Sequence, residues 1–501
     1  MPSWLPSSTS AGIFGSALAL VVAHMVTSAV RNVFLCPIPR PVPGPWLAKL
    51  TSKWMTCVEL SGARATTINK LHERYGPVAQ LGSNEVSFKS PDCVRAIYGT
   101  GTTCVKPPAY DAFGKKGMFQ MQDPAEHRAR QKQIAHVFAP RSLLEMESLI
   151  QDVTAQLVEA LRKRAGTAVD SLHWTRMAAL DNAGEILLGK SFDAVKGDGQ
   201  VPLYVHHLDN AYLSLALYAN FPILYKILES LPIPSLRQFL SSKEYVYEYG
   251  DNAMKECISR FGRESKRQTI ITRMISGDPY KGTAPLSDDI ISLEVSNAVF
   301  AATDTTGNAM SYALYRMASH PDWQAKLRDE IRSSGSKAAG YPFQTLQALP
   351  ILHGVMNETL RLHPPAPASL PRMTTRNGCE IGGMYFPGKT LVSMQAYTTN
   401  RHPNCFPEPE AFKPDRWIAN GTITAGSSEQ RDMSLSWGKG TRSCLGQHMA
   451  VMELKIMLAR VVDDFEVTLE SLKTHDDMKT TDHFTLIPKG GRCGLVFSPA
   501  V

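Results

Sequence analysis

The segment SWGKGTRSCLG, residues 436–446, surrounds one cysteine, Cys444, with three glycines and two basic residues. The residues that follow it, QHMAVMELKIMLARVV, have the apolar spacing of a helix, so Cys444 stands just before a helix N-terminus. The helix dipole and the nearby basic groups favour the thiolate, the form of cysteine that ligates metal ions. Because glycine has no side chain, this loop is predicted to approach a large planar ligand closely.

Arg442 lies two residues before Cys444. In an extended segment these side chains point to the same side, so both can serve one ligand. This combination suits a haem, with the sulfur on iron and the guanidinium on a propionate. A free cysteine is also often a small buried hydrophobic residue, and the segment alone leaves both interpretations open.

A second stretch, ETLR at residues 358–361, places Glu358 and Arg361 three residues apart, so on a helix they share a face and can pair. Most such pairs are solvated surface contacts. Here the surrounding sequence, ILHGVMNETLRLHPP, is largely apolar. An ion pair in such surroundings needs further hydrogen-bond partners.

A third stretch, NAVFAATDTTGNAM at residues 297–310, repeats Asn297, Ala301 and Thr305 every four residues along one helix face. Asp304 adjoins Thr305 within this otherwise apolar helix. One interpretation is that the hydroxyl and carboxyl groups bond back to the helix and loosen it. The other is a water-binding notch that passes protons to an oxygen species on a metal.

The N-terminal segment predicts a membrane anchor. Residues 11–30 contain no Asp, Glu, Lys or Arg, and their number is close to the roughly 20 that a helix needs to span a bilayer. A cleaved signal peptide is the alternative, but no basic residue precedes the apolar stretch. Arg31 and Arg40 follow it, so the positive-inside rule places the rest of the chain in the cytosol.

The remaining chain is expected to form one large domain. We assign residues 1–31 to the anchor segment and residues 32–46, with the proline-rich CPIPRPVPGPW, to a stiff hinge. Residues 47–501 then form the globular body. Helical periodicity appears in 142–164, 285–318 and 447–462, and short strand patterns in 78–82, 85–89, 379–386, 390–395 and 493–497. The predicted fold class is mainly α with small peripheral β-sheets.

Charge and cysteine usage exclude some functions. The net charge is +7 over 501 residues and the basic residues are scattered, which gives little support to nucleic-acid binding. The nine cysteines show no CxxC pairing, which indicates a reducing compartment and no zinc site. The apolar stretch 211–225 is too short to span a bilayer. It predicts either a core helix or a surface that touches the membrane near a substrate mouth.

Taken together and in order, these motifs resemble those of the cytochrome P450 family of haem-thiolate monooxygenases. SWGKGTRSCLG is similar to the family's FxxGxRxCxG loop, ETLR to its ExxR helix, and AATDTT to its oxygen-activation helix. FKPDRW (412–417) resembles the segment whose arginine joins the ExxR pair. The anchor followed by a proline hinge is similar to microsomal members, and residues 71–88 and 123–139 are similar to filamentous-fungal members of secondary metabolism.

The resemblance implies a role for each matching residue. Cys444 would be the axial ligand of haem b, and Asp304 and Thr305 would organise water and proton delivery to dioxygen. The haem would also be bound by Arg442, Arg372, His127, Gly440, Gly446 and Trp437. Glu358, Arg361 and Arg416 would form a structural network beside it. The pocket would be lined by residues from 106–119, including Tyr110 and Phe113, and by Asn297, Phe300, Ala301, Ala368, Ser369 and Phe484.

Three positions depart from the family pattern. Trp437 replaces the usual phenylalanine of the ligand loop, and Ala302 replaces the usual glycine of the distal helix. Gln131 occupies the place, four residues after His127, where many members have an arginine that binds a propionate. Arg128 and Arg130 are the candidate substitutes for it.

The resemblance implies insertion of one oxygen atom from O2 into a lipophilic small molecule of fungal secondary metabolism. The electrons would come from NADPH through a membrane-bound reductase, with cytochrome b5 as a further partner. The expected location is the endoplasmic reticulum membrane, with a single-pass anchor and a cytosolic catalytic domain. The same haem could instead support desaturation, ring closure or oxidative coupling. An alternative of another class is a non-catalytic haem-binding membrane protein.

Overall fold

The computed structural model describes residues 23, 26–36, 38–39, 41–265, 268–277 and 285–500, and most of this part is helical. The longer helices are α4 (Arg64–Tyr75), α6 (Pro124–Ile134), α8 (Glu147–Arg162), α9 (Ser171–Ala183), α10 (Leu203–Asn220), α13 (Ser242–Phe261), α15 (Asp288–Ser319), α16 (Pro321–Ser333), α18 (Pro350–Leu362) and α21 (Gln447–Asp464).

Shorter helical elements connect them. They are α2 (Trp46–Leu50), α3 (Lys53–Leu60), α5 (Pro91–Tyr98), α7 (Pro140–Leu144), α11 (Pro222–Ser230), α12 (Pro234–Leu240), α14 (Ile270–Ser276), α17 (Phe343–Leu346), α19 (Ala396–Thr399), α20 (Ser428–Met433) and α22 (Lys473–Asp477). Single turns of other helix types are η1 (Pro108–Phe113), η2 (Ala135–Phe138), η3 (Gly184–Leu188), η4 (Pro414–Trp417) and η5 (Gly440–Arg442).

The strands form small sheets. One sheet has the order β1 (Val78–Gly82), β2 (Glu85–Phe88), β7 (Leu391–Ser393) and β4 (Arg372–Met373), and a second has β10 (Phe465–Leu469), β13 (Gly494–Pro499) and β3 (Ala168–Asp170). The two-stranded sheets are β5 (Cys379–Ile381) with β6 (Met384–Phe386), β8 (Ile418–Ala419) with β9 (Thr422–Ile423), and β11 (Thr480–His483) with β12 (Thr485–Pro488). In the first sheet β1 and β2 are antiparallel, whereas β2 and β7 are parallel.

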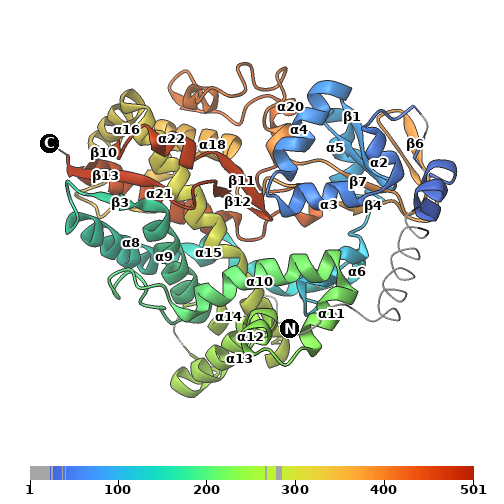
Figure 1. Cartoon of the computed structure of the whole chain (residues 1–501). Coiled ribbons are helices and arrows are strands. Elements are labelled where there is room, and N and C mark those ends of the chain that lie inside the picture. Colours follow the sequence, from blue (N-terminus) through green and yellow to red (C-terminus); the bar gives the residue numbers. More distant parts are fainter. Residues whose placement is uncertain are drawn as a thin grey trace, which may run out of the picture.

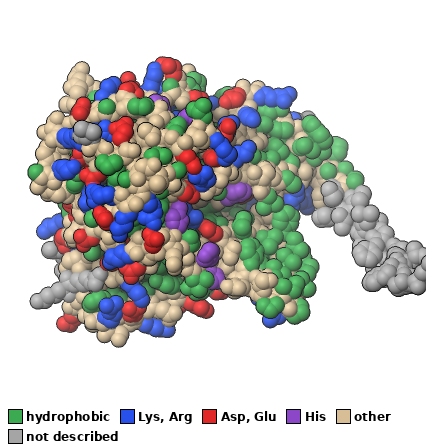
Figure 2. Space-filling model, turned by 60° about the vertical axis from the view of Figure 1, so that its left-hand side comes forward, with side chains coloured by type: hydrophobic (Ala, Val, Ile, Leu, Met, Phe, Trp, Pro, Cys, Tyr) green, Lys and Arg blue, Asp and Glu red, His purple; other side chains and the backbone are tan. Residues whose placement is uncertain are grey.

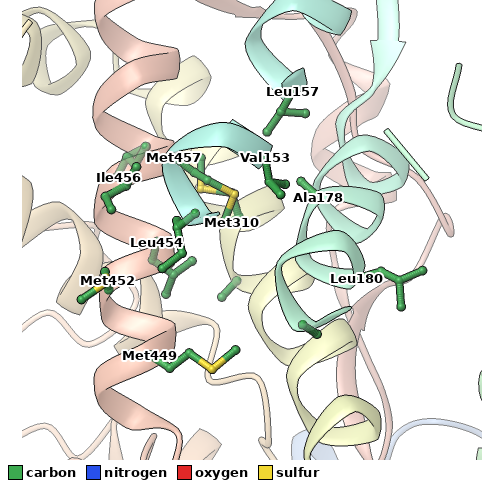
Figure 3. Packing of buried hydrophobic residues seen from close by; sticks show 14 of the residues in the cluster. Val153, Leu157, Ala178, Leu180, Met310, Met449, Met452, Leu454, Ile456 and Met457 are labelled. Atoms are coloured by element: carbon green, nitrogen blue, oxygen red, sulfur yellow. The ribbon is translucent and has the colours of Figure 1, made fainter. Parts of the chain in front are cut away.

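Helix α15 passes through the centre of the helical region and packs against α9, α13, α18 and α21 (Figure 1). It is apolar on nearly all sides, and such a helix has to be enclosed by other elements. It begins with Asp288 and Asp289, whose carboxylates interact favourably with the helix dipole. Figure 3 shows Met310 of α15 close to Val153 of α8 and Met457 of α21, all buried. This core holds α15 and α21 in fixed positions on either side of the site described below.

The predicted fold class, mainly α with small sheets, is confirmed, and the boundaries differ in three places. The predicted helix 142–164 is interrupted after α7, and α8 begins at Glu147. The predicted strand 379–386 is the hairpin β5–β6, because Gly382 and Gly383 both adopt positive φ and form a tight turn. The apolar stretch 211–225 divides at Pro222, which begins α11.

Most of the predicted anchor at residues 11–30 lies outside the described residues, and residues 26–34 are helical. Within the described ranges, no helix combines the length and apolar character needed to cross a bilayer. The predicted hinge is not a free spacer throughout, because Ile38 and Val42 are buried in the apolar cluster beneath the first sheet. The amide of Gln80 in β1 also donates to the carbonyl of Pro43.

Candidate functional site

A cavity of about 390 Å³ lies between α15, the start of α21 and the segment that carries η1. It is lined mainly by apolar side chains. Residues 436–438 and 442–446 form one wall, and Tyr212 of α10 and Phe484 of the β11–β12 turn contribute to others. Two of the stretches singled out in the sequence, those with Thr305 and Cys444, meet in this one space together with Arg372. An apolar cavity with a few convergent polar groups is typical of a small-molecule site.

The cysteine loop folds tightly against its own backbone. The amide of Cys444 donates to the carbonyl of Trp437 at 2.8 Å, and the amide of Ser443 donates to the carbonyl of Gly440 at 3.1 Å. Gly440 has a φ of +65°, and a Cβ there would stand 2.0 Å from the carbonyl oxygen of Tyr98. A Cβ on Gly446, which lines the cavity, would meet nothing within 4 Å. Gly440 thus serves the fold, and Gly446 leaves the cavity open.

The thiol of Cys444 is exposed within the cavity, because it has accessible surface and is among the cavity-lining residues. Burial in the protein raises its pKa, and the backbone amides of Gly446 and Gln447 at the start of α21 act in the opposite direction. A metal cation bound to the sulfur would favour the thiolate further. The loop therefore offers one sulfur ligand, oriented by backbone hydrogen bonds, to a metal in the cavity.

Besides Lys243, which pairs with Glu244 at 3.6 Å, four groups that can carry positive charge line the cavity: Lys106, His127, Arg372 and Arg442. Arg442 donates to the carbonyls of Met121 and Gln122, and Arg372 donates to those of Leu370 and Pro371. In the described part of the chain no carboxylate lies within 4 Å of these cations. Buried charge without a partner is unfavourable. The arrangement therefore fits a planar group with anionic carboxylates and a metal, as in haem.

The distal helix α15 separates the two residues that sequence reasoning paired. Thr305 lines the cavity, and its hydroxyl donates to the carbonyl of Ala301 at 2.8 Å. Asp304 is buried outside the cavity lining and accepts from Nε of Arg176 in α9 at 2.9 Å. Arg176 also contacts Asp209 of α10 at 2.7 Å. Burial raises the pKa of Asp304, while Arg176 opposes that rise.

The distal part of the cavity is aromatic. The Phe113 ring lies 5.0 Å from that of Phe484, 5.3 Å from that of Phe119 and 6.1 Å from that of Tyr110, measured between centroids. The Tyr212 ring lies 4.6 Å from that of Phe300 of α15, tilted by 48°. Phe484 has a φ of +74°, a region that bulky residues rarely adopt. This strained turn between β11 and β12 directs the phenyl ring at the other rings.

The structure places most of the predicted pocket residues in the cavity wall: Tyr110, Phe113, Asn297, Phe300, Ala301 and Phe484. Trp437 and Ala302, two of the departures from the family pattern, line it as well. Gly440 does not, and neither do Ala368 and Ser369. The wall in that region is formed by Pro365, Ala366 and Leu370 instead. The segment bends at its prolines, and spacing alone did not predict which side chains face inward.

The predicted Glu358–Arg361–Arg416 network exists and lies beside the cavity. Arg361 donates twice to the Glu358 carboxylate at 2.8 Å, and both side chains are fully buried. Arg416 adds a contact to Glu358 at 3.1 Å, and the indole of Trp417 donates to Glu358 at 3.0 Å. The remaining guanidinium donors of Arg361 reach backbone carbonyls of residues 400, 409 and 411. Every charge is thus hydrogen-bonded, as a buried ion pair requires.

Two charged residues at the site belong to none of the motifs. Lys106 begins the segment 106–119, which the resemblance placed at the pocket, but nothing in the sequence marked it as a charged residue of the cavity wall. Arg176 lies in no predicted site segment. Neither proposed substitute for the arginine missing at Gln131 reaches the cavity. Arg128 is exposed on α6, and Arg130 pairs with Glu294 at 2.6 Å.

Comparison with known proteins points to one family. Residues 40–494 match the family model described as Cytochrome P450. A cytochrome P450 monooxygenase of Aspergillus terreus, tazI, is 26% identical over 485 residues, 95% of this chain and 97% of that protein. The trichothecene C-15 hydroxylase of Fusarium sporotrichioides is 27% identical and covers 89% of this chain and 91% of its own.

A third relative, the tryprostatin B 6-hydroxylase of Aspergillus fumigatus, is 28% identical over 85% of this chain and 75% of its own. Among solved structures, the haem domain of cytochrome P450DA superposes with a TM-score of 0.78. It covers 93% of this chain and 99% of its own length, at 17% identity. At 17% identity the superposition shows only that the two proteins share a fold.

Proposed function

Because the chain belongs to the cytochrome P450 family and is a haem-thiolate monooxygenase, we propose that it oxidises a lipophilic small molecule of fungal secondary metabolism. The electrons for this reaction would come from NADPH. A membrane-bound reductase would deliver the electrons, with cytochrome b5 as a further partner. The observation that carries the proposal is the Cys444 thiol, exposed in an apolar cavity beside cations that have no carboxylate partner. The named relatives, which include hydroxylases from fungi, support the substrate class.

The residues have distinct tasks. When bound, the haem supplies an iron that activates dioxygen, and a thiolate ligand favours cleavage of the O–O bond. Cys444 would hold the iron, and Arg442, Arg372 and His127 would hold the carboxylates. Thr305 keeps a hydroxyl inside the cavity, where it can hold water and pass a proton. The aromatic wall excludes bulk water and orients an apolar substrate against α15.

The test of the function is spectroscopic and kinetic. Reduced protein with carbon monoxide should give the red-shifted Soret band of a thiolate haem. With reductase and a fungal extract as the source of substrate, the protein should consume NADPH and incorporate label from ¹⁸O₂ into a product. A folded, haem-loaded protein without that band would refute thiolate ligation. A normal band without NADPH consumption would favour the non-catalytic haem protein.

Thr305→Ala tests proton delivery. We expect product formation to fall by about two orders of magnitude, the lower end of the range typical for a proton-transfer group. The fraction of NADPH electrons that appears as hydrogen peroxide should rise several-fold, because the activated oxygen is released before it reacts. Thr303→Val is the matched control, since the Thr303 hydroxyl is buried on the same helix and donates to Val299 away from the cavity. Unchanged coupling in Thr305→Ala would exclude this role.

We also propose a single-pass anchor at residues 11–30 in the endoplasmic reticulum membrane, with the catalytic domain in the cytosol. Exposed apolar side chains support it, and Figure 2 shows hydrophobic side chains gathered on one side of the molecule. Phe34, Leu35, Trp46, Ile223 and Ile227 are among the exposed large apolar side chains. The side chain of Asn32 reaches the carbonyl of Leu50, and Lys53 of α3 reaches that of Asn220 beside α11, so these segments are neighbours.

The anchor proposal predicts how the chain fractionates. The full chain should remain in the membrane pellet after an alkaline carbonate wash. A chain that lacks residues 1–31 should be washed off in large part, since only the apolar surface patch remains to hold it. Complete release of the full chain would contradict the anchor.

A further inference from the structure

Two side-chain amides, those of Gln120 and Asn297, interrupt the mainly apolar wall of the cavity. Gln120 lies between η1 and α6 and is only 2% exposed, and Asn297 lies on α15. Each amide has one buried atom without a hydrogen-bond partner among the described residues: Oε1 of Gln120 and Nδ2 of Asn297. Such atoms are rare in proteins, because they have lost their hydrogen bonds to water and gained none in exchange.

The neighbouring groups fix which end of each amide is free. Nε2 of Gln120 donates to the carbonyl of Phe113 and to Oδ1 of Asn297, both at 3.4 Å. A carbonyl oxygen only accepts, so Gln120 has to present its nitrogen to Phe113, and its oxygen is left over. The Asn297 oxygen faces that nitrogen and also lies 3.3 Å from the Tyr247 hydroxyl. What remains is therefore one donor, on Asn297, and one acceptor, on Gln120.

The free donor and the free acceptor lie close to one another. A Cβ on Gly117 would stand 2.3 Å from Nδ2 of Asn297 and 3.3 Å from Oε1 of Gln120. Gly117 does not have a positive φ, so the backbone itself does not require glycine at this position. The missing side chain leaves room for the Asn297 amide instead. One small polar group of a ligand can thus serve both free atoms.

The acidic residue beside this pair already has its counter-ion. Glu294, three residues before Asn297 on α15, accepts from Arg130 at 2.6 Å and from the amide of Met118 at 2.9 Å. A paired carboxylate of this kind does not require a cationic ligand. The two amides therefore offer a site for a neutral group.

We propose that Gln120 and Asn297 bind a neutral polar group of the substrate that both accepts and donates a hydrogen bond, a hydroxyl or a secondary amide. Its oxygen accepts from Nδ2 of Asn297, and its O–H or N–H donates to Oε1 of Gln120. The bonds that hold the two amides are 3.3–3.4 Å long, near the upper limit for hydrogen bonds, so turning their free ends to the cavity costs little. The inference rests on the proposed function and narrows its lipophilic substrate to one that carries such a group.

The main test compares three compounds that share one carbon ring: cyclooctanol, cyclooctanone and cyclooctane. The alcohol accepts and donates, the ketone only accepts, and the hydrocarbon does neither. Equilibrium dialysis against the haem-loaded protein measures each affinity. Gln120→Met removes the acceptor and should weaken cyclooctanol about five- to tenfold, the effect of one hydrogen bond, without changing cyclooctanone. Asn297→Leu removes the donor and should weaken the alcohol and the ketone alike, without changing cyclooctane.

Gln122→Met is the matched control, because it makes the same substitution two residues further along the segment. Gln122 donates to Asp111 at 2.8 Å and does not line the cavity, so all three affinities should equal those of the wild type. Circular dichroism and the cyclooctane affinity check that each variant keeps its fold. Asn297→Ala removes the same donor with less bulk and replaces Asn297→Leu if the leucine does not fit.

The pattern of losses decides between a binding role and a structural one. Equal losses of all three compounds in Gln120→Met and Asn297→Leu would show that the amides only shape the wall, and would overturn the proposal. Unchanged cyclooctanol affinity in both variants, or loss of cyclooctanone in Gln120→Met, would also overturn it. Haem-loaded wild type without the red-shifted carbon monoxide band would instead refute the proposed function. Dialysis does not depend on that band, so the two failures are distinguishable.

Discussion

Replacing Arg361 with methionine is expected to lower the free energy of unfolding by about 3–5 kcal/mol, the range found when one partner of a buried ion pair is removed. The substitution leaves the Glu358 carboxylate fully buried beside only one cation, Arg416. It also leaves the carbonyls of Asn400, Pro409 and Ala411 without their donor. Because these carbonyls belong to the segment before η4, we expect that segment to loosen. Urea unfolding of the holoenzyme, followed by circular dichroism, measures the effect.

The chain offers a close control for this change. Arg162 and Glu159 form an ion pair with the same three-residue spacing on a helix, but both side chains are about half exposed. Arg162→Met should therefore cost no more than about 1 kcal/mol, as surface pairs do. The triple variant Glu358→Leu, Arg361→Met and Arg416→Met should be more stable than Arg361→Met alone, because it removes all three charges of the network and leaves none of them buried without a partner. Equal costs for Arg361→Met and Arg162→Met would show that burial does not govern this pair.

The sequence predicted best the residues that act over short distances along the chain. Cys444 and Arg442 stand two residues apart in a loop, and Glu358 and Arg361 three apart on a helix, so local geometry alone places each pair. The structure brings both thiol and guanidinium to the cavity and pairs the two charges. Spacing along the chain does not show which way a side chain points. The sequence suggested a joint role for Asp304 and Thr305, but adjacent residues on a helix point in different directions, and Asp304 contacts Arg176.

Residues that reach the site through tertiary contacts had no such signal. Arg176 meets Asp304 across 128 positions, and Lys106 reaches the cavity because a single bridge ties Val105 to Met373. No periodicity or spacing reveals a pairing of that kind. The predicted boundaries of the strand 379–386 were wrong for a related reason. Gly382 and Gly383 divide one expected strand into a hairpin, since two consecutive residues with positive φ reverse the chain.

Replacing Cys444 with serine is expected to abolish the red-shifted Soret band of the reduced carbon monoxide complex and to lower monooxygenase turnover by about two orders of magnitude or more, because the axial ligand sets the reactivity of the iron. Haem should still be retained in part, since Arg442, Arg372 and the cavity wall are unchanged. The fold should be nearly unaffected, because the backbone–backbone hydrogen bonds that shape the loop do not involve the sulfur and a serine oxygen can accept from the amides of Gly446 and Gln447 in its place.

Two measurements separate this ligand role from a general effect of losing a thiol. Cys57→Ser removes an exposed free thiol on α3 and should leave the band, the haem content and turnover as in wild type. Cys444→Ser should keep the circular dichroism of the wild type while its carbon monoxide band moves to the position typical of a haem without thiolate. If Cys444→Ser kept the red-shifted band, the iron ligand would have to be another cysteine. None of the other cysteines in the described part of the chain lines the cavity, so Cys444 is the one described thiol placed to bind a metal there.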